Sequence, residues 1–495
     1  MPITRILIAN RGEIAVRVAK SCRALGIASV AVYSDADRDA LHVRAADAAL
    51  RIGGPEAKHS YLDIAALIDA ARKSGADAVH PGYGFLSQNG DFADACAEAG
   101  LVFIGPPGDV HRRMGDKQGA RRLMASAGVP VVPGYDGDEQ QDEALLREAG
   151  RIGWPVMIKP SRGGGGKGLR IVRAAEQFAS SLQASRREAK AAFGDERVVL
   201  ERFVSRPRHV EVQVLADTQG RTLHLHEREC SLQRRHQKVV EETPSPALSP
   251  ETRERLCAAG VAAARAASYV NAGTVEFLLD PEGRFYFLEM NTRLQVEHPV
   301  TEAVTGLDLV RLQIEIASGR PLALTQDQIA PRGHALECRI YAEDPDNDDL
   351  PAPGRVLLCV PPIAPGVRFD AGIETGSEVT VHYDPLLAKL VTHGADRAFA
   401  IARMRAALRE TVVLGVRTNL ARLQAILDHP EFVAGNLHTG FLDEHKRALA
   451  KRASLPDEAL AAAAAALQLS NGDRRPLVTA DPWSQLGAWR IDGAS

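Results

Sequence analysis

Short apolar runs alternate with amphipathic stretches through the N-terminal part of the chain. Arg5–Ala9 and Ala28–Tyr33 have the length and composition of buried strands, and Gly12–Leu25 between them has apolar residues at helical spacing. Ala76–His80 and Leu101–Ile104 are two further strand-like runs. Strands that alternate with helices favour a parallel sheet with helices on its faces, so the pattern predicts an α/β fold.

A glycine-rich loop lies between two more apolar runs. Trp154–Lys159 and Leu169–Val172 are predicted strands, and Gly163–Gly168 joins them. Because Lys167 is followed by Gly168 and a strand, the loop is not a Walker phosphate loop, which continues into a helix. A glycine hairpin can fold over phosphates and offer them backbone N–H groups, and we favour this interpretation over a flexible surface hairpin.

A second hairpin is predicted near the middle of the chain. Val275–Leu279 and Arg284–Asn291 alternate as strands, and Asp280–Gly283 between them has the residue preferences of a type I turn. If the first and last turn residues pair, Glu276 lies opposite Phe287 and Glu289 is its diagonal neighbour. A register displaced by one residue would instead place the two carboxylates on opposite faces.

On the predicted register, Glu276, Glu289 and Asn291 share one face of this hairpin. Their oxygens are the hard ligands that suit Mg²⁺ or Mn²⁺ held together with phosphates. The alternative is an ordinary polar face exposed to solvent. Phe285 and Phe287 would lie on the same face, and exposure of their aromatic rings makes this alternative less favourable.

The segment after the hairpin, Arg293-Leu294-Gln295-Val296-Glu297-His298-Pro299, alternates polar and apolar residues. Arg293 can clamp a planar anion and Glu297 can act as a general base, so three polar groups could face one pocket. The simpler alternative is a surface ion pair between Arg293 and Glu297.

A histidine- and cysteine-rich stretch raises the question of zinc. His224, His226, Cys230 and His236 lie close together, but their spacing does not follow the usual zinc pattern. The neighbouring Arg and Lys residues suit an anion better than a cation. We therefore rank zinc low, and we rank a nucleophilic Cys230 equally low beside a buried inert thiol.

Composition narrows the class of protein. The chain has 495 residues, which predicts roughly three domains. Its 60 basic and 63 acidic residues give a net charge of −3, and 45% of its residues are hydrophobic, which excludes a disordered chain and argues against nucleic-acid binding. Six scattered cysteines and the lack of a long apolar run predict a reduced, cytoplasmic protein that does not span a membrane.

Seven stretches of the chain form long motifs: Ile6–Ala15, His80–Ser87, Glu201–Val204, His209–Gln213, Arg228–Lys238, Glu289–Glu302 and Arg339–Pro345. These motifs resemble those of the biotin carboxylases, which belong to the ATP-grasp superfamily. The resemblance covers roughly residues 3 to 445, and the chain departs from the family pattern at Gln88, Pro160 and Arg162.

The resemblance implies an ATP-grasp fold with a parallel-sheet N-terminal domain, a glycine-lid subdomain and a mixed α/β C-terminal domain. The expected boundaries are 1–115, then 116–333 with the lid at about 130–203, then 334–446. Residues 447–495 would be an Ala-rich linker and the start of a further domain. Asp481-Pro482-Trp483-Ser484 in this tail resembles α subunits of acyl-CoA carboxylases of the methylcrotonyl and geranyl types.

The resemblance also implies roles for individual residues. Those expected to bind ATP are Lys117 and Lys159 at the phosphates, Gly165 and Gly166 in the lid, Glu201, Val204 and Leu437 at the adenine, and His209, Gln233 and His236 at the ribose or phosphates. Two Mg²⁺ or Mn²⁺ ions would be bound by Glu276, Glu289 and Asn291. Bicarbonate would be surrounded by Lys238, Arg293, Gln295, Val296 and Glu297, and Arg339 would face the ureido oxygen of biotin.

The implied reaction is ATP-dependent carboxylation of biotin by bicarbonate through carboxyphosphate, with Lys238, Arg293, Glu297 and Arg339 as catalytic residues. Biotin would arrive on a carrier domain or protein, since the chain lacks an Ala-Met-Lys-Met acceptor motif. A carboxyltransferase β subunit and a second copy of the chain are the other expected partners. The alternatives are another ATP-grasp ligase or a nucleotide-binding module without activity.

Overall fold

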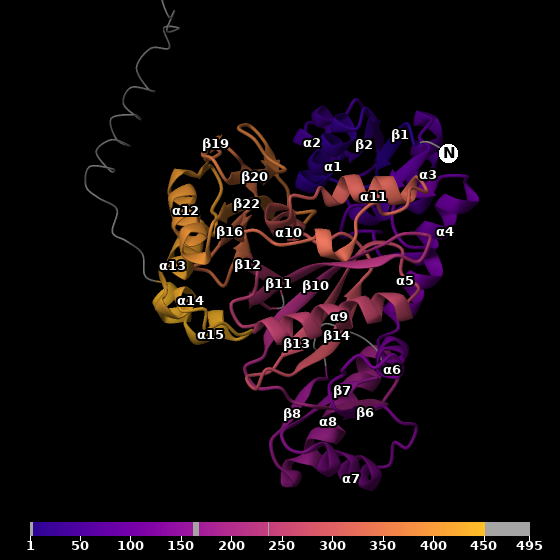
Figure 1. Ribbon diagram of the computed structural model, residues 1–495, viewed down its shortest axis with the longest axis vertical. Helices are drawn as coiled ribbons and strands as arrows, with labels where there is room; N and C mark the ends of the chain where they lie inside the picture. Colours follow the sequence, from indigo (N-terminus) through magenta and orange to yellow (C-terminus); the bar gives the residue numbers. More distant parts are fainter. Residues whose placement is uncertain (1–2, 162–167, 236, 451–495) are drawn as a thin grey trace, which may run out of the picture. The chain divides into compact units, whose positions relative to one another are not determined.

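The computed structural model of the chain describes residues 3–161, 168–235 and 237–450 (Figure 1). Residues 1–450 form one compact unit. Gly165, Gly166, His236 and the predicted tail elements lie outside the described residues.

The N-terminal region contains the predicted parallel sheet, with strand order β3-β2-β1-β4-β5. One strand, β3 (Ala48–Gly53), was not predicted, because its apolar residues do not form a continuous buried run. The other strands are β1 (Arg5–Ile8), β2 (Ala28–Ser34), β4 (Ala78–His80) and β5 (Val102–Phe103). The helices are α1 (Gly12–Ala24), α2 (Leu41–Ala45), α3 (Ile64–Ser74), α4 (Gly90–Glu98) and α5 (Gly108–Gly115), with short 3₁₀ turns at Asp35–Asp37 and Ala57–His59.

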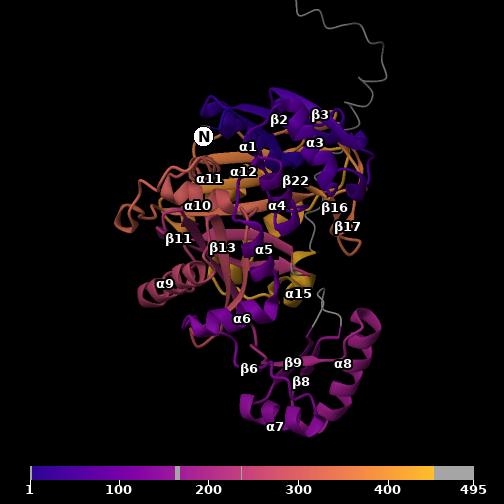
Figure 2. The same cartoon turned by 90° about the vertical axis from the view of Figure 1, so that its right-hand side faces the viewer.

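A small four-stranded sheet, ordered β6-β9-β7-β8, contains the strands on either side of the glycine-rich segment. β7 (Val156–Pro160) and β8 (Arg170–Val172) pair antiparallel, which confirms that two strands flank the loop. Figure 2 shows α7 (Asp142–Ile152) and α8 (Phe178–Phe193) beside this sheet, on which they pack. The remaining elements are α6 (Lys117–Ser126), β6 (Gly134–Tyr135), a 3₁₀ turn (Ala175–Gln177) and β9 (Val198–Arg202).

A large antiparallel sheet forms the centre of the compact unit, in the order β14-β13-β10-β11-β12-β15-β22-β20. It continues across the expected boundary at residue 333, because strands from both sides of it pair directly. Its strands are β10 (Arg208–Ala216), β11 (Thr222–Arg234), β12 (Gln237–Thr243), β13 (Asn271–Leu279), β14 (Phe285–Asn291), β15 (His334–Tyr341), β20 (Val367–Ala371) and β22 (Leu386–Gly394).

Helices cover this sheet along its length. α9 (Pro250–Ala266) packs on β10 and β11, and α12 (Arg397–Glu410) packs on β22. The others are α10 (His298–Thr305), α11 (Leu309–Ala317), α13 (Leu420–Asp428), α14 (Pro430–Val433), α15 (Phe441–Glu444) and α16 (Lys446–Leu449), with a 3₁₀ turn at Gln326–Gln328. Short strand pairs complete the C-terminal part: β16 (Glu343–Asp344) with β17 (Leu350–Pro351), β18 (Gly354–Arg355) with β21 (Glu378–Val379), and β19 (Leu358–Val360) with β23 (Val412–Leu414).

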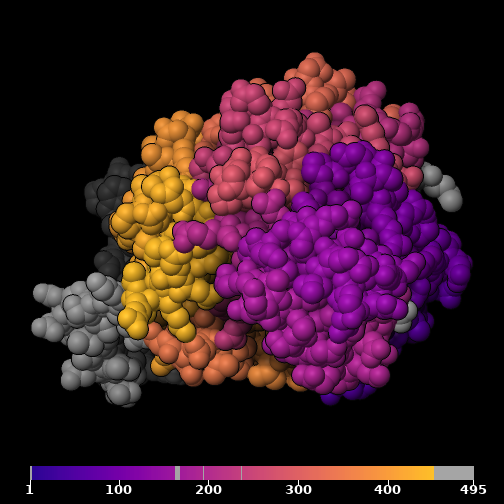
Figure 3. Space-filling view, turned by 90° about the horizontal axis from the view of Figure 1, so that it is seen from below, coloured from indigo at the N-terminus to yellow at the C-terminus, as the bar shows by residue number. Residues whose placement is uncertain are grey.

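The last helices return to the start of β10. Figure 3 shows them in yellow, seen from below. Arg206 forms an ion pair with Glu444 at 2.5 Å, and the Thr439 N–H donates to the Pro207 carbonyl at 2.9 Å. These contacts connect the segment that follows the small sheet to the C-terminal helices.

The predicted register of the β13–β14 hairpin is wrong, in an informative way. Near the turn Phe277 pairs with Phe287, a displacement of one residue that would separate the two carboxylates. A bulge then leaves Leu288 without an opposite residue, and Glu276 pairs directly with Glu289. The bulge therefore returns both carboxylates to one face.

The expected position of two aromatic residues is wrong for the same reason. Phe285 and Phe287 do not share the carboxylate face but pack edge-to-face on Phe277, in the core beneath α9. Glu276 is nevertheless only 4% exposed, so the alternative of a solvated polar face does not hold for it.

Candidate functional site

The candidate site is centred on a lysine that contacts three carboxylates. Lys238 on β12 places its Nζ 2.5 Å from Glu211, 3.0 Å from Glu276 and 2.5 Å from Glu297. The carboxylates come from β10, β13 and the residue before α10, so four segments far apart in the sequence meet at one ammonium.

Glu297 lies between two cations in the interior. Its side chain is 0% exposed, and its second oxygen accepts a hydrogen bond from Arg339 at 3.0 Å. Burial would raise the pKa of Glu297, but Lys238, Arg339 and Arg228 together hold that pKa well below its usual value. The group is therefore an anion, and the predicted alternative of a surface pair between Arg293 and Glu297 is wrong.

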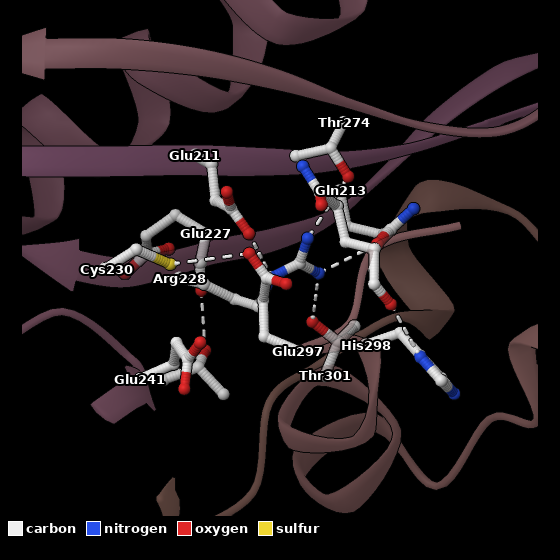
Figure 4. Close-up of polar contacts among 12 residues, drawn as sticks. Glu211, Gln213, Glu227, Arg228, Cys230, Glu241, Thr274, Glu297, His298 and Thr301 are labelled. Atoms are coloured by element: carbon white, nitrogen blue, oxygen red, sulfur yellow. Dashed lines mark hydrogen bonds and ion pairs between the residues drawn. The ribbon is translucent and has the colours of Figure 1, made fainter. Parts of the chain in front are cut away.

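A completely buried arginine, Arg228, lies beside Glu297 (Figure 4). Arg228 on β11 donates to Glu211 at 2.6 Å and to Gln213 at 2.7 Å, and it also donates to Thr301 at 2.9 Å and to Thr274 at 3.1 Å. One oxygen of Glu211 is thus bound by Arg228 and the other by Lys238. A buried ion pair with its hydrogen bonds satisfied gives a fixed geometry.

Arg339 is held by a second acid, Glu241. The Arg339 Nε donates to Glu241 at 2.5 Å, and both side chains are almost fully buried. Burial raises the pKa of Glu241 to about 7; Arg339 opposes this rise, and Glu297 adds to it. Glu241 therefore changes charge near neutral pH, directly beside the arginine expected to face biotin.

The carboxylate hairpin offers the oxygens expected of a divalent metal site. Glu276 accepts hydrogen bonds from Asn291 and Gln295, each at 2.9 Å, and lies 3.0 Å from His209. Burial would raise the pKa of Glu276, but Lys238 and His209 hold it well below the usual value. With Glu289 directly opposite, two carboxylates and an amide oxygen form a hard set that fits Mg²⁺ or Mn²⁺.

The residues expected at bicarbonate also come together. Arg293 donates to Gln295 at 2.8 Å and to Asn291 at 3.1 Å, next to Glu276. The Val296 carbonyl accepts a hydrogen bond from Lys389 at 2.7 Å. Next to them lies a cavity of about 350 Å³, whose lining includes Tyr83, Gln237, Arg293, Val296, Arg339 and Tyr341.

The residues expected at the nucleotide are less closely connected. Lys159 on β7 forms an ion pair with Glu201 on β9. Lys117 begins α6 and is exposed, whereas Val204 is half-buried after β9. Gln233 and Leu437 are buried, the latter in the core of the C-terminal part.

Cys230 is a buried thiol next to the site. Its Sγ lies 3.9 Å from Glu297, and burial raises its pKa well above the usual value, with Glu211 acting in the same direction. Because a protonated thiol is a poor nucleophile, the surroundings of Cys230 favour a buried inert thiol. In the described structure the cysteine that joins His224 and His226 is Cys257, not Cys230.

Sequence reasoning missed three residues of the network: Glu211, Arg228 and Glu241. Each lies in a strand whose neighbouring residues are buried. A charged residue at a core position requires a partner. The run Val210-Glu211-Val212-Gln213-Val214 carried this signal, but the partner could not be deduced without the strand order.

The large antiparallel sheet, its carboxylate hairpin and the charged network around Lys238 together place the chain in the class of ATP-grasp proteins. Comparison with known proteins then specifies the family. Residues 2–110 match the biotin carboxylase N-terminal domain, and residues 337–444 match the biotin carboxylase C-terminal domain. Residues 116–325 match the ATP binding domain of the carbamoyl-phosphate synthase L chain.

Similar curated proteins and solved structures agree with these domain matches. The chain is 52% identical to a biotin carboxylase of Nostoc sp. over 90% of this chain and 99% of that protein. It is 52% identical to rat mitochondrial methylcrotonoyl-CoA carboxylase subunit alpha over 90% of this chain, but it spans only 63% of that relative. The biotin carboxylase domain dimer of Hydrogenobacter thermophilus 2-oxoglutarate carboxylase, solved with MgADP, ADP and bicarbonate, superimposes with a TM-score of 0.84 at 43% identity, covering 92% of this chain and 100% of that one. The chain belongs to the biotin carboxylase family.

None of the helices in the described ranges has the length and apolarity needed to cross a bilayer.

Proposed function

We propose that this chain carboxylates biotin with bicarbonate and ATP. The observation that carries the proposal is the buried Glu297 carboxylate, which lies between Lys238 and Arg339 and shares Lys238 with the carboxylate hairpin. Membership of the biotin carboxylase family supports the same reaction.

In the proposed first step, Glu297 removes the proton of bicarbonate while Lys238, Arg293, Gln295 and Val296 bind the anion. The bicarbonate oxygen attacks the γ-phosphorus of ATP, and ADP leaves from carboxyphosphate. When bound by Glu276, Glu289 and Asn291, Mg²⁺ or Mn²⁺ ions supply charge neutralisation for the phosphates.

The contacts of Glu297 suggest how substrates activate it. As bicarbonate and biotin bind, they compete for Lys238 and Arg339, the cations that hold the pKa of Glu297 low. Burial remains and raises that pKa, so the carboxylate becomes a stronger base when both substrates are present.

In the second step carboxyphosphate breaks down to CO₂ and phosphate. The phosphate takes the N1′ proton of biotin, and the resulting enolate attacks CO₂. The cavity beside Arg339 is the proposed biotin pocket, where the guanidinium stabilises the developing oxyanion.

For ATP, we propose that Lys117 and Lys159 bind the phosphates and that Glu201, Val204 and Leu437 surround the adenine. His209, Gln233 and His236 would contact the ribose or the phosphates. The lid glycines Gly165 and Gly166 would close over the phosphates and exclude water.

We also propose the wider setting. The chain spans 63% of the rat and 65% of the mouse methylcrotonoyl-CoA carboxylase subunit alpha. By its similarity to them, we propose that it supplies the first half-reaction of an acyl-CoA carboxylase. A biotin carrier, a carboxyltransferase β subunit and a second copy of the chain are its proposed partners. All six cysteines are free, which suits a reducing compartment, and we propose the cytoplasm.

The test is ADP release by the purified chain, measured with and without bicarbonate and with and without free biotin. We expect release to require bicarbonate and to be stimulated by biotin. Bicarbonate-dependent release that biotin does not stimulate would favour a ligase with another acceptor. Nucleotide binding without any release would favour a module without activity.

A further inference from the structure

A second cluster of metal-binding side chains lies on the opposite face of the large sheet from Glu211. His224 and His226 of β11 and Cys257 of α9 have ligand atoms that all lie within 4.8 Å of one another. His224 pairs with Val214, whose side chain belongs to the core beneath α9. This cluster is separate from the carboxylates around Lys238.

A β-bulge brings the two histidines together. The pairing of β10 with β11 slips between Val212 and Val214, so that two residues of β11 lie opposite Gln213 alone. His226 occupies this bulge with φ of 64°, a left-handed conformation that glycine usually adopts. Its ring meets that of His224 edge-on, with the centroids 5.1 Å apart.

The hydrogen bonds of His226 determine which of its nitrogens is available. The His226 Nε2 lies 2.9 Å from the Ile329 carbonyl, which can only accept, so Nε2 carries the proton. The Nδ1 lone pair is then free, and this atom is buried without a hydrogen-bond partner among the described residues. A metal-binding histidine typically donates its other N–H to a carbonyl in this way.

The other two groups are also suited to a metal. Burial lowers the pKa of His224 to about 4, so its ring is neutral and able to coordinate at pH 7. Cys257 is 1% exposed. Burial and the nearby Glu227 raise the pKa of its thiol, while Arg253, which pairs with Glu227 at 2.8 Å, opposes the rise. Without a metal the thiol therefore keeps its proton.

We propose that His224, His226 and Cys257 bind one Zn²⁺ ion, with water as the fourth ligand. Two imidazoles and a thiolate are the borderline-soft set that zinc prefers, whereas Mg²⁺ prefers the carboxylates of the β13–β14 hairpin. Binding breaks the S–H bond of Cys257, forms a zinc–sulfur bond and releases one proton. The ion joins α9 to β11, and this inference does not depend on the proposed carboxylase activity.

The test uses Co²⁺ as a spectroscopic substitute for zinc. The full-length chain is reduced, freed of metals and titrated with Co²⁺ in excess Mg²⁺, which occupies the carboxylate site. We expect one equivalent to give a near-ultraviolet thiolate-to-cobalt absorption, which Zn²⁺ abolishes. Because binding releases one proton, the affinity for Co²⁺ should rise about tenfold per pH unit as long as the pH is below the pKa of the Cys257 thiol.

Two variants and one control locate the site. Cys257→Ser should lose the absorption, and His226→Gln should weaken Co²⁺ binding at least about tenfold, because each removes one ligand. Cys359→Ser changes a thiol elsewhere in the chain and should leave the titration unchanged. The proposal is overturned if the unmodified chain gives no thiolate absorption, or if the His226→Gln protein binds with undiminished affinity. If Cys257→Ser does not fold, His226→Gln alone decides, since its side chain is only half-buried.

Discussion

Lys238 and Lys159, two lysines of the proposed site, lie in opposite surroundings. Lys238 contacts three carboxylates, and its side chain is 11% exposed, whereas Lys159 forms an ion pair with one carboxylate, Glu201, within the described ranges and is 30% exposed. The large sheet thus fixes the groups proposed for bicarbonate before any substrate binds. On the small sheet, Lys159 and Glu201, which are proposed to bind the nucleotide, remain partly exposed to solvent.

The largest effect is expected for Glu297→Gln. The amide cannot accept the bicarbonate proton, so biotin-dependent ADP release should fall by about 10²- to 10⁴-fold. Nucleotide binding, measured by calorimetry, should persist, because Glu297 is not among the residues proposed to bind ATP. Glu315→Gln on α11 is the control and should keep full activity. Unchanged turnover of the Glu297 variant would refute its role as the base.

Next in size is Arg339→Lys. An ammonium keeps the charge but cannot contact Glu241, Glu297 and the biotin oxygen in the geometry of a guanidinium. We expect biotin carboxylation to fall by about 10²- to 10³-fold, with a smaller loss of bicarbonate-dependent ADP release in the absence of biotin. Equal losses in both assays would show that Arg339 does not act specifically on biotin.

Glu289→Gln tests the carboxylate hairpin. Removal of one anionic ligand should shift the Mg²⁺ concentration for half-maximal activity upward by at least about tenfold. Glu282→Gln, in the exposed turn of the same hairpin, is the matched control. A magnesium titration that superimposes on that of the unmodified chain would exclude Glu289 as a ligand.

The two lysines can be compared directly. Lys238→Met removes the cation that Glu211, Glu276 and Glu297 share and should lower the free energy of unfolding by about 3–5 kcal/mol. Lys159→Met breaks a partly exposed pair and should change it by no more than about 1 kcal/mol, while raising the KM for ATP. Chemical denaturation of the two variants measures their free energies of unfolding. Equal destabilisation would contradict the proposed difference between the surroundings of the two lysines.

The smallest effect is expected for Glu241→Gln and concerns pH. In the unmodified chain, Glu241 gains a proton as the pH falls through about 7, and Arg339 then loses an anionic partner. As the pH falls through this range, we expect kcat/KM for biotin, measured at fixed bicarbonate concentration, to decrease a few-fold. The variant is neutral at every pH, so it should lack this step. A step of the same size in both proteins would assign it to another group.

Much of the fold could be predicted from the sequence, because the strands that carry it are continuous apolar runs. β1, β2, β7, β8 and the β13–β14 hairpin all follow from local patterns. The register of that hairpin did not, because the bulge at Leu288 depends on how Phe285 and Phe287 pack beneath α9. Turn residues alone carry no information about a bulge further along the strand.

Some residues of the candidate site could likewise be predicted from local sequence patterns, and others could not. Glu276, Glu289 and the Arg293–Glu297 run could be found from spacing, since they lie on one hairpin and the segment that directly follows it. Glu211 and Arg228 could not, because their partners come from other strands of the sheet. Cys257 lies on a helix remote in sequence from His224 and His226, so the sequence drew attention to Cys230 instead.

The most direct measurement follows oxygen from bicarbonate. In the proposed reaction, bicarbonate activated by Glu297 attacks ATP itself, so a turnover in ¹⁸O-bicarbonate transfers one bicarbonate oxygen to the phosphate released. Mass spectrometry should find one ¹⁸O per phosphate in biotin-dependent turnover and little phosphate of any kind from Glu297→Gln. Phosphate that carries oxygen only from water would contradict the account.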